Sequence, residues 1–188
     1  MSDEDASGPD GTDGDDRGSD DPLAALAFDG GPIDARVDHV GIAVESVADA
    51  EPLLELLGAE KLVDEPDHDQ GFRWAYFELG DASRLELIAP IPGEESFLTG
   101  YLERSGPGLH HVTIEVADVE AATDALEAGG VTVVDHAERE GYTEAFVPPS
   151  EASGVLYQLM EYHESYADAH GNSALIGGAP LWAGDEDE

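Results

Sequence analysis

Residues 37–44 read VDHVGIAV, and residues 109–116 read LHHVTIEV. Small and β-branched residues dominate both stretches, which favours a strand in each. His39 is the third residue of the first stretch, and His111 is the third residue of the second. A histidine repeated at the same place on two similar strands indicates that the chain contains one structural unit twice.

An acidic and an amide side chain show the same spacing. Glu86 lies in RLELI and Gln158 lies in LYQLM, and the interval between them equals the interval from His39 to His111. Two imidazoles, one carboxylate and one amide oxygen suit an octahedral divalent cation that keeps positions open for substrate. We therefore expect His39, Glu86, His111 and Gln158 to bind a divalent metal; the sequence does not distinguish cobalt, manganese, nickel, zinc and iron.

The segments around these residues predict the order strand, helix, strand, strand, strand in each half of the chain. The expected strands of the first half are 37–44, 60–63, 72–79 and 84–89, with a polar loop at 64–70. Those of the second half are 109–116, 131–134, 142–147 and 155–161.

Residues typical of helix starts and ends occur at similar places in both halves. The first helix is expected to begin at Ser46 and to end at Gly58, and the second to begin at Asp118 and to end at Gly129. A connecting helix is expected at 96–102. The apolar face of the first helix is predicted to consist of Leu53, Leu54, Leu56 and Leu57.

The charge of the chain excludes nucleic acid as a partner. It has 44 acidic and 7 basic residues and a net charge of −37, so its surface repels polyanions. A hydrophobic share of 41% and the periodic runs favour a folded protein from a salt-rich cytoplasm over a disordered acidic one. At about 1 M salt the Debye length is about 3 Å, so the repulsion is largely screened.

Features that the sequence lacks exclude several further kinds of site and of protein. There is no cysteine, which excludes disulfides and zinc–thiolate sites. No run approaches the roughly 20 apolar residues of a membrane span, and no signal-peptide pattern is visible. We expect a cytoplasmic protein with no membrane partner.

Composition divides the chain into three parts. Residues 1–32 are predicted to be a disordered acidic arm, and 166–188 a flexible acidic tail, because both are rich in Gly, Ala, Ser and acidic residues. The body, 33–165, contains the repeat.

Five motifs, in this order and on this βαβββ pattern, resemble the vicinal oxygen chelate superfamily, which includes glyoxalases, bleomycin-resistance proteins and dioxygenases. Within it the chain is most similar to methylmalonyl-CoA epimerases, over about residues 36–162. The motifs are DHVGIAV at 38–44, DQG at 69–71, LELIAP at 85–90, GPGLHH at 106–111 and GVLYQL at 154–159.

This resemblance implies an α+β fold. Two βαβββ modules, about 36–90 and 108–162, would form a pair of curved mixed-sheet half-barrels around a central metal site. It also implies ligands at His39, Glu86, His111 and Gln158, and a proton transfer next to a thioester through a metal-stabilised enolate. The substrate would be a small acyl-CoA, and the assembly a homodimer.

The chain departs from the epimerase pattern at two positions. Gln158 stands where the family has a Glu that serves as ligand and base, and Trp74 stands where the second base would fall. Neither side chain can take up a proton in the required pKa range. GFRWAYF at 71–77 aligns with GYTEAFV at 141–147, however, and this makes Glu144 the counterpart of Trp74. Our hypothesis is that Glu86 and Glu144 form the acid/base pair.

Three alternatives remain open at this point. A glyoxalase I-like lyase uses a similar ligand set, an extradiol dioxygenase needs a carboxylate where Gln158 stands, and a metal-free antibiotic-sequestering module shares the fold. The few basic side chains, Arg36, Arg73, Arg84, Arg104 and Arg139, leave little to hold the phosphates of coenzyme A, and Arg73 and Arg84 flank the expected site in the sequence. His110 is expected to point to the opposite face of its strand from His111. Solvent exposure is expected for His68, His136, His163 and His170.

Overall fold

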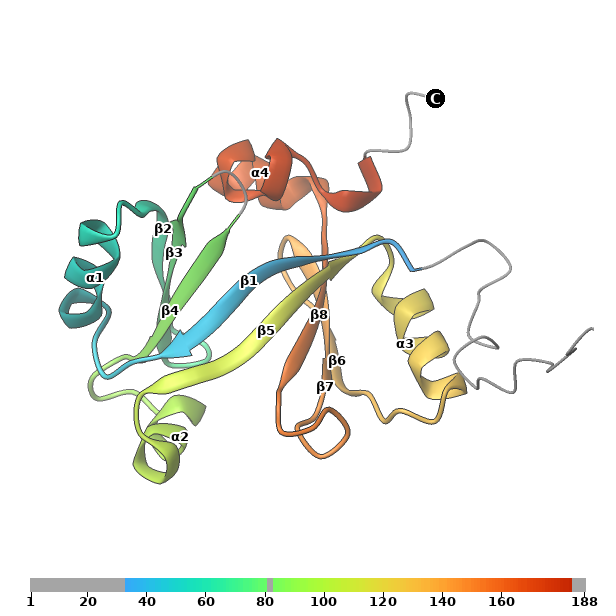
Figure 1. The fold of residues 1–188 in the computed structure, drawn as a ribbon, viewed down its shortest axis with the longest axis horizontal. Coiled ribbons are helices and arrows are strands. Elements are labelled where there is room, and N and C mark those ends of the chain that lie inside the picture. The colour runs from blue at the N-terminus through green and yellow to red at the C-terminus, as the bar shows by residue number, and fades with distance from the viewer. Residues whose placement is uncertain (1–32, 81–82, 184–188) are drawn as a thin grey trace, which may run out of the picture.

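A computed structural model describes residues 33–80 and 83–183 (Figure 1). The predicted acidic arm, 1–32, and the last five residues lie outside the described residues. Eight strands are present in the described part: β1 (Ala35–Ala43), β2 (Glu60–Asp67), β3 (Phe72–Glu78), β4 (Arg84–Pro90), β5 (Gly108–Val116), β6 (Val134–Glu138), β7 (Tyr142–Val147) and β8 (Tyr157–Tyr162). The helices there are α1 (Val47–Leu56), α2 (Phe97–Ser105), α3 (Val119–Ala128) and α4 (Glu164–His170), followed by two 3₁₀ turns, Asn172–Ala174 and Ile176–Gly178.

The strands form one curved mixed sheet in the order β2-β3-β4-β1-β5-β8-β7-β6. β1 and β5 run antiparallel through its centre, and each has its own module's last strand as a parallel neighbour, β4 and β8 (Figure 1). Module one, β1 to β4, and module two, β5 to β8, therefore have the same order and the same pairing. The predicted α+β fold of two βαβββ modules is confirmed.

One helix packs on each module. α1 buries Val47 and Leu54 against Ala75, Phe77 and Leu87. In module two, α3 buries Val119 and Ala122 with Val116 and Leu159. α3 begins where the sequence predicts, with the Asp118 carboxylate accepting a hydrogen bond from the Ala121 amide at 2.8 Å. No helix among the described residues is long and apolar enough to cross a membrane.

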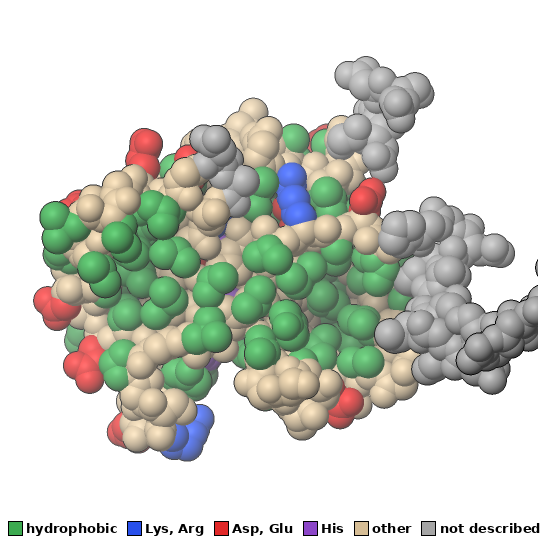
Figure 2. Space-filling model, viewed as in Figure 1, with side chains coloured by type: hydrophobic (Ala, Val, Ile, Leu, Met, Phe, Trp, Pro, Cys, Tyr) green, Lys and Arg blue, Asp and Glu red, His purple; other side chains and the backbone are tan. Residues whose placement is uncertain are grey.

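The apolar face predicted for α1 is wrong in most of its members. Only Leu54 is buried, whereas Leu53, Leu56 and Leu57 are 64%, 87% and 59% exposed. Val47 and Leu54 are seven residues apart and occupy the side of the helix that meets the sheet, and the other three leucines point away from it. Figure 2 shows hydrophobic side chains gathered on the face that carries α1 and the central strands.

Two strand boundaries also differ from prediction. β2 continues to Asp67, through the segment expected to be a polar loop, because it pairs with β3 as far as Phe72. The strand expected at 131–134 begins only at Val134. Val131 instead donates its backbone amide to the Leu126 carbonyl at 2.9 Å and so belongs to the end of α3.

The segment after β8 is ordered, in contrast to the flexible tail expected from residue 166. Tyr166 and Leu175 are buried in a cluster with Tyr76 and Tyr162. The Trp182 indole nitrogen donates to the Tyr162 carbonyl at 2.7 Å. Apolar residues spaced among glycines thus pack against side chains of β2, β3 and β8, although composition alone indicates a loose tail.

Candidate metal centre and active site

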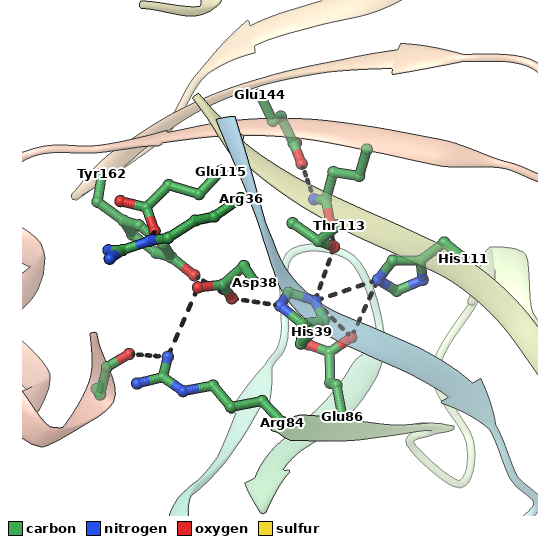
Figure 3. A network of polar contacts seen from close by, with 12 residues as sticks. Arg36, Asp38, His39, Arg84, Glu86, His111, Thr113, Glu115, Glu144 and Tyr162 are labelled. Atoms are coloured by element: carbon green, nitrogen blue, oxygen red, sulfur yellow. Dashed lines mark hydrogen bonds and ion pairs between the residues drawn. The ribbon is translucent and has the colours of Figure 1, made fainter. Parts of the chain in front are cut away.

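Three of the predicted ligands come together at the centre of the sheet. His39 on β1, Glu86 on β4 and His111 on β5 are buried, and their ligand atoms lie within 4.8 Å of one another. The two Nε2 atoms are 3.3 Å apart, and Glu86 Oε2 is 3.6 Å from the first and 3.3 Å from the second (Figure 3). Three neighbouring strands therefore point one donor each at the same small volume.

The pairing of β1 with β5 makes room for this cluster. Gly41 lies opposite His111 in the register. A Cβ atom at residue 41 would overlap the imidazole ring of His111. Glycine is therefore required at this position by the close approach of the ring, and not by an unusual backbone angle.

The charges in the cluster keep Glu86 in the ionised form that can bind a metal. Burial by itself would raise the pKa of Glu86, but the charges of His39 and His111 outweigh it and lower that pKa. Two imidazole nitrogens and an ionised carboxylate are suitable ligands for a divalent transition metal. The residues present thus fit the group that the sequence predicts.

Asp38 supports His39 from behind. Its Oδ2 lies 2.6 Å from His39 Nδ1 and accepts a 3.0 Å hydrogen bond from the Tyr162 hydroxyl (Figure 3). Burial would raise the pKa of Asp38, but the hydrogen bond to His39 and the charges of His39 and Arg84 lower it. An ionised Asp38 holds the proton of the ring on Nδ1 and leaves Nε2 free for a metal.

The predicted orientation of His110 is wrong. The register of β1 and β5 skips this residue between His111 and Leu109, which marks a β-bulge. A bulge breaks the strict alternation of side chains, so His110 lies on the same side as His111, with their Nδ1 atoms 2.9 Å apart. Burial, and then the charge of His111, lower the pKa of His110 to about 4.

Gln158 lies beside the three-residue cluster and is linked to it by Thr113. The Thr113 hydroxyl is 2.8 Å from His39 Nε2 and 2.7 Å from Gln158 Oε1. Sequence reasoning missed Thr113. The signal was present, because Thr113 occupies the place in the second stretch that Gly41 has in the first, and so breaks the repeat there.

Glu144 lies one step further from the cluster, on β7. Its Oε2 accepts a 2.8 Å hydrogen bond from Gln158 Nε2, and its Oε1 accepts one from Arg139 at 2.8 Å. The predicted equivalence of Glu144 and Trp74 is confirmed. Each residue lies opposite the position two places beyond the Gln or Glu of its own module's last strand, Met160 for Glu144 and Ile88 for Trp74.

A cavity of about 1060 Å³ opens over these groups. Its lining includes Glu86, His111, Gln158 and Glu144, together with aromatic side chains and Arg139. The aromatic residues are Phe72, Trp74, Tyr76, Phe97, Tyr142, Phe146 and Tyr166. The volume and its mixed lining suit a small organic substrate with one polar end.

Three further predictions about basic side chains can be compared with this cavity. His170 is not solvent-facing: its side chain is 15% exposed and its ring lies 4.4 Å from that of Tyr166 at the cavity wall. Arg84 is buried and donates to the Ala174 carbonyl at 2.6 Å, so it does not line the cavity. Arg73 lies outside as well, paired with Asp64 at 2.6 Å.

Comparisons with known proteins agree with this arrangement. The family model described as "Glyoxalase/Bleomycin resistance protein/Dioxygenase superfamily" matches residues 38–147. The chain is 36% identical to the Bacillus subtilis protein YqjC, over 67% of this chain and 91% of that one. It is also 36% identical to the ethylmalonyl-CoA/methylmalonyl-CoA epimerase of Cereibacter sphaeroides, over 67% of this chain and 97% of that enzyme.

A solved structure extends the likeness to three dimensions. Methylmalonyl-CoA epimerase from Mycobacterium tuberculosis superimposes with a TM-score of 0.63 at 34% identity, covering 70% of this chain and 91% of that enzyme. The chain therefore belongs to the glyoxalase/bleomycin resistance protein/dioxygenase superfamily, among the relatives of the methylmalonyl-CoA epimerases.

Proposed function

We propose that this protein is a metal-dependent epimerase that inverts the carbon next to the thioester of an acyl-CoA of the methylmalonyl-CoA type. The observation that carries the proposal is the buried His39–Glu86–His111 cluster at the floor of a cavity that also contains a separate carboxylate, Glu144. The kinship with epimerases supports the substrate class.

The ligands proposed for the metal are His39, Glu86, His111 and Gln158. A bound divalent cation would act as a Lewis acid and lower the barrier to removing a proton next to a carbonyl group. Glu86 and Glu144 are the proposed acid/base pair, because they are the two buried carboxylates among those that line the cavity. Inversion requires one group to remove the α-proton and another to return a proton on the opposite face.

The aromatic residues of the cavity would surround the acyl part and exclude water. Arg139 is the one Arg or Lys side chain that lines the cavity among the described residues, and it already pairs with Glu144. We therefore propose that Arg139 holds the carboxylate of Glu144 in place, and that the phosphates of coenzyme A lie in solvent. We further propose a homodimer, as the resemblance to the epimerases implies, and a salt-rich cytoplasm, in which the repulsion between acidic side chains is screened.

The test is hydrogen exchange at the α-carbon of methylmalonyl-CoA in deuterated, salt-rich buffer. The substrate should incorporate deuterium when the protein is loaded in turn with cobalt, manganese, nickel, zinc and iron(II). It should not do so with protein treated with a chelator. Loaded protein that leaves the α-proton in place under every one of these metals would remove the proposal.

A further inference from the structure

We propose that Thr113 is a positioning residue: its hydroxyl fixes the side-chain amide of Gln158 so that the amide nitrogen faces Glu144. This inference rests on the proposed function, in which Glu144 moves a proton. Thr113 is fully buried, at 0% exposure, and reaches two groups of the site, His39 Nε2 and Gln158 Oε1, at 2.8 and 2.7 Å.

A count of hydrogens fixes the direction of these contacts. Asp38 holds the proton of His39 on Nδ1. Nε2 therefore carries a lone pair on the side where Glu86 and His111 lie. A hydroxyl has one hydrogen to give. Once that lone pair is committed to a metal, the acceptor left to Thr113 is Gln158 Oε1. A carbonyl oxygen has two lone pairs, so Oε1 can still serve as a ligand.

The rest of the amide then has one arrangement. With Oε1 turned to Thr113, Nε2 of Gln158 donates to Glu144 Oε2 at 2.8 Å, while Arg139 donates to the other oxygen of the carboxylate at 2.8 Å. Glu144 is thereby held by two donors in a fixed position at the cavity wall. A reversed amide would place an oxygen against an oxygen of Glu144, which is repulsive.

Module one has no counterpart of this arrangement. Gly41 occupies the place of Thr113, and Trp74 the place of Glu144. The hydroxyl is thus found only in the module whose last strand carries an amide beside a carboxylate. This also accounts for Gln at position 158, because a Glu there would face Glu144 with no hydrogen to donate.

The side-chain amide can be observed directly by NMR. The chain has only three carboxamide side chains, Gln70, Gln158 and Asn172, so Gln158→Glu identifies its signal by removing it. We expect slow solvent exchange of the Gln158 amide hydrogens in ¹⁵N-labelled protein loaded with diamagnetic zinc. Thr113→Val should speed this exchange at least about tenfold, since a buried hydrogen-bonded group becomes free to rotate.

A matched pair of variants separates the hydroxyl from the fold. Thr113→Ser keeps the hydroxyl and should retain wild-type amide exchange, whereas Thr113→Ala removes it without adding bulk. In the α-proton assay Thr113→Val and Thr113→Ala should lose about three- to tenfold in kcat, the worth of one hydrogen bond, with zinc content unchanged.

Equal amide exchange in Thr113→Ser and Thr113→Ala would overturn the inference. So would slow amide exchange in Thr113→Val with wild-type turnover. The amide signal is measured without substrate. A wild-type protein that fails to exchange the α-proton of methylmalonyl-CoA therefore refutes the proposed function and leaves the test of the hydrogen bond intact.

Discussion

Modules one and two share a backbone plan and differ at four matched positions in or directly behind the candidate site. Each pairs its last strand in parallel with its first, and each first strand carries a buried histidine. At the matched positions, however, module one and module two contain Glu86 and Gln158, Trp74 and Glu144, Asp38 and His110, and Gly41 and Thr113.

This difference separates what the fold needs from what the chemistry needs. Packing of the half-barrels depends on apolar residues that both modules supply in similar patterns. The proposed inversion at carbon needs two proton-transfer groups, and these four differences lie where such groups would act or be held. Of Glu86 and Trp74 in module one, only Glu86 is a carboxylate, and of Gln158 and Glu144 in module two, only Glu144 is. Neither pair therefore places two carboxylates against each other.

The largest expected effect tests whether the carboxylate of module two is a base. Glu144→Gln should lower α-proton exchange by about 10²- to 10⁴-fold, the usual contribution of general acid–base catalysis. Bound zinc should stay at the wild-type level, because Glu144 is not among the proposed ligands. Steady-state kinetics and metal analysis of the same sample measure both quantities.

Glu138→Gln is the control, since Glu138 lies on the neighbouring strand β6 and is exposed. It should behave as wild type. Full activity of the Glu144→Gln protein with metal bound would assign the proton transfer to another group and would make the Trp74/Glu144 difference irrelevant to catalysis.

The next effect concerns the different groups behind the two histidines. Asp38→Asn should weaken zinc binding by about 10- to 100-fold, because a carboxylate that orients a ligand histidine and raises its basicity is lost. Competition with a chelating dye measures the affinity. Asp34→Asn, on an exposed residue just before β1, should leave it unchanged, and an equal loss in both variants would point to surface charge instead.

The sequence could predict the repeat and the clustering of His39, Glu86 and His111 because both depend on local spacing. One shared interval matches His39 with His111 and Glu86 with Gln158, and the alignment of GFRWAYF with GYTEAFV correctly pairs Trp74 with Glu144. What it could not predict depends on non-local contacts. The orientation of His110 follows from a bulge that only strand pairing reveals.

Packing partners explain the other differences. Leu53, Leu56 and Leu57 look like a core face, yet the sheet reaches only one side of α1. Residues beyond 166 look loose by composition, yet Tyr166 and Leu175 find an apolar surface between β2 and β8. The role of Thr113 could not be predicted, because it depends on contacts of its hydroxyl with His39 and Gln158 that only the fold creates.

A smaller effect is expected from adding a side chain at Gly41, the module-one counterpart of Thr113. Gly41→Ala should lower the free energy of unfolding by about 1–3 kcal/mol, as other insertions into packed cores do, because the new Cβ overlaps His111. Urea denaturation at fixed salt measures it. Gly100→Ala is the matched control: it lies in α2, where a Cβ meets only the flexible end of Arg104, so it should be neutral or stabilising. Equal stability of the two variants would contradict the close approach of Gly41 and His111.

The smallest effect compares the outer faces of the two module helices. Leu56 on α1 is 87% exposed, and its counterpart in the repeat is Ala128 at the end of α3. Leu56→Ala should therefore change the free energy of unfolding by less than about 0.5 kcal/mol. Leu54→Ala, on the buried side of the same helix, should cost about 2–5 kcal/mol. Both are measured by urea denaturation at fixed salt and at several protein concentrations. A loss for Leu56→Ala that approaches the Leu54→Ala value would mean that this face of module one is covered in solution, since burial is what makes a leucine costly to truncate.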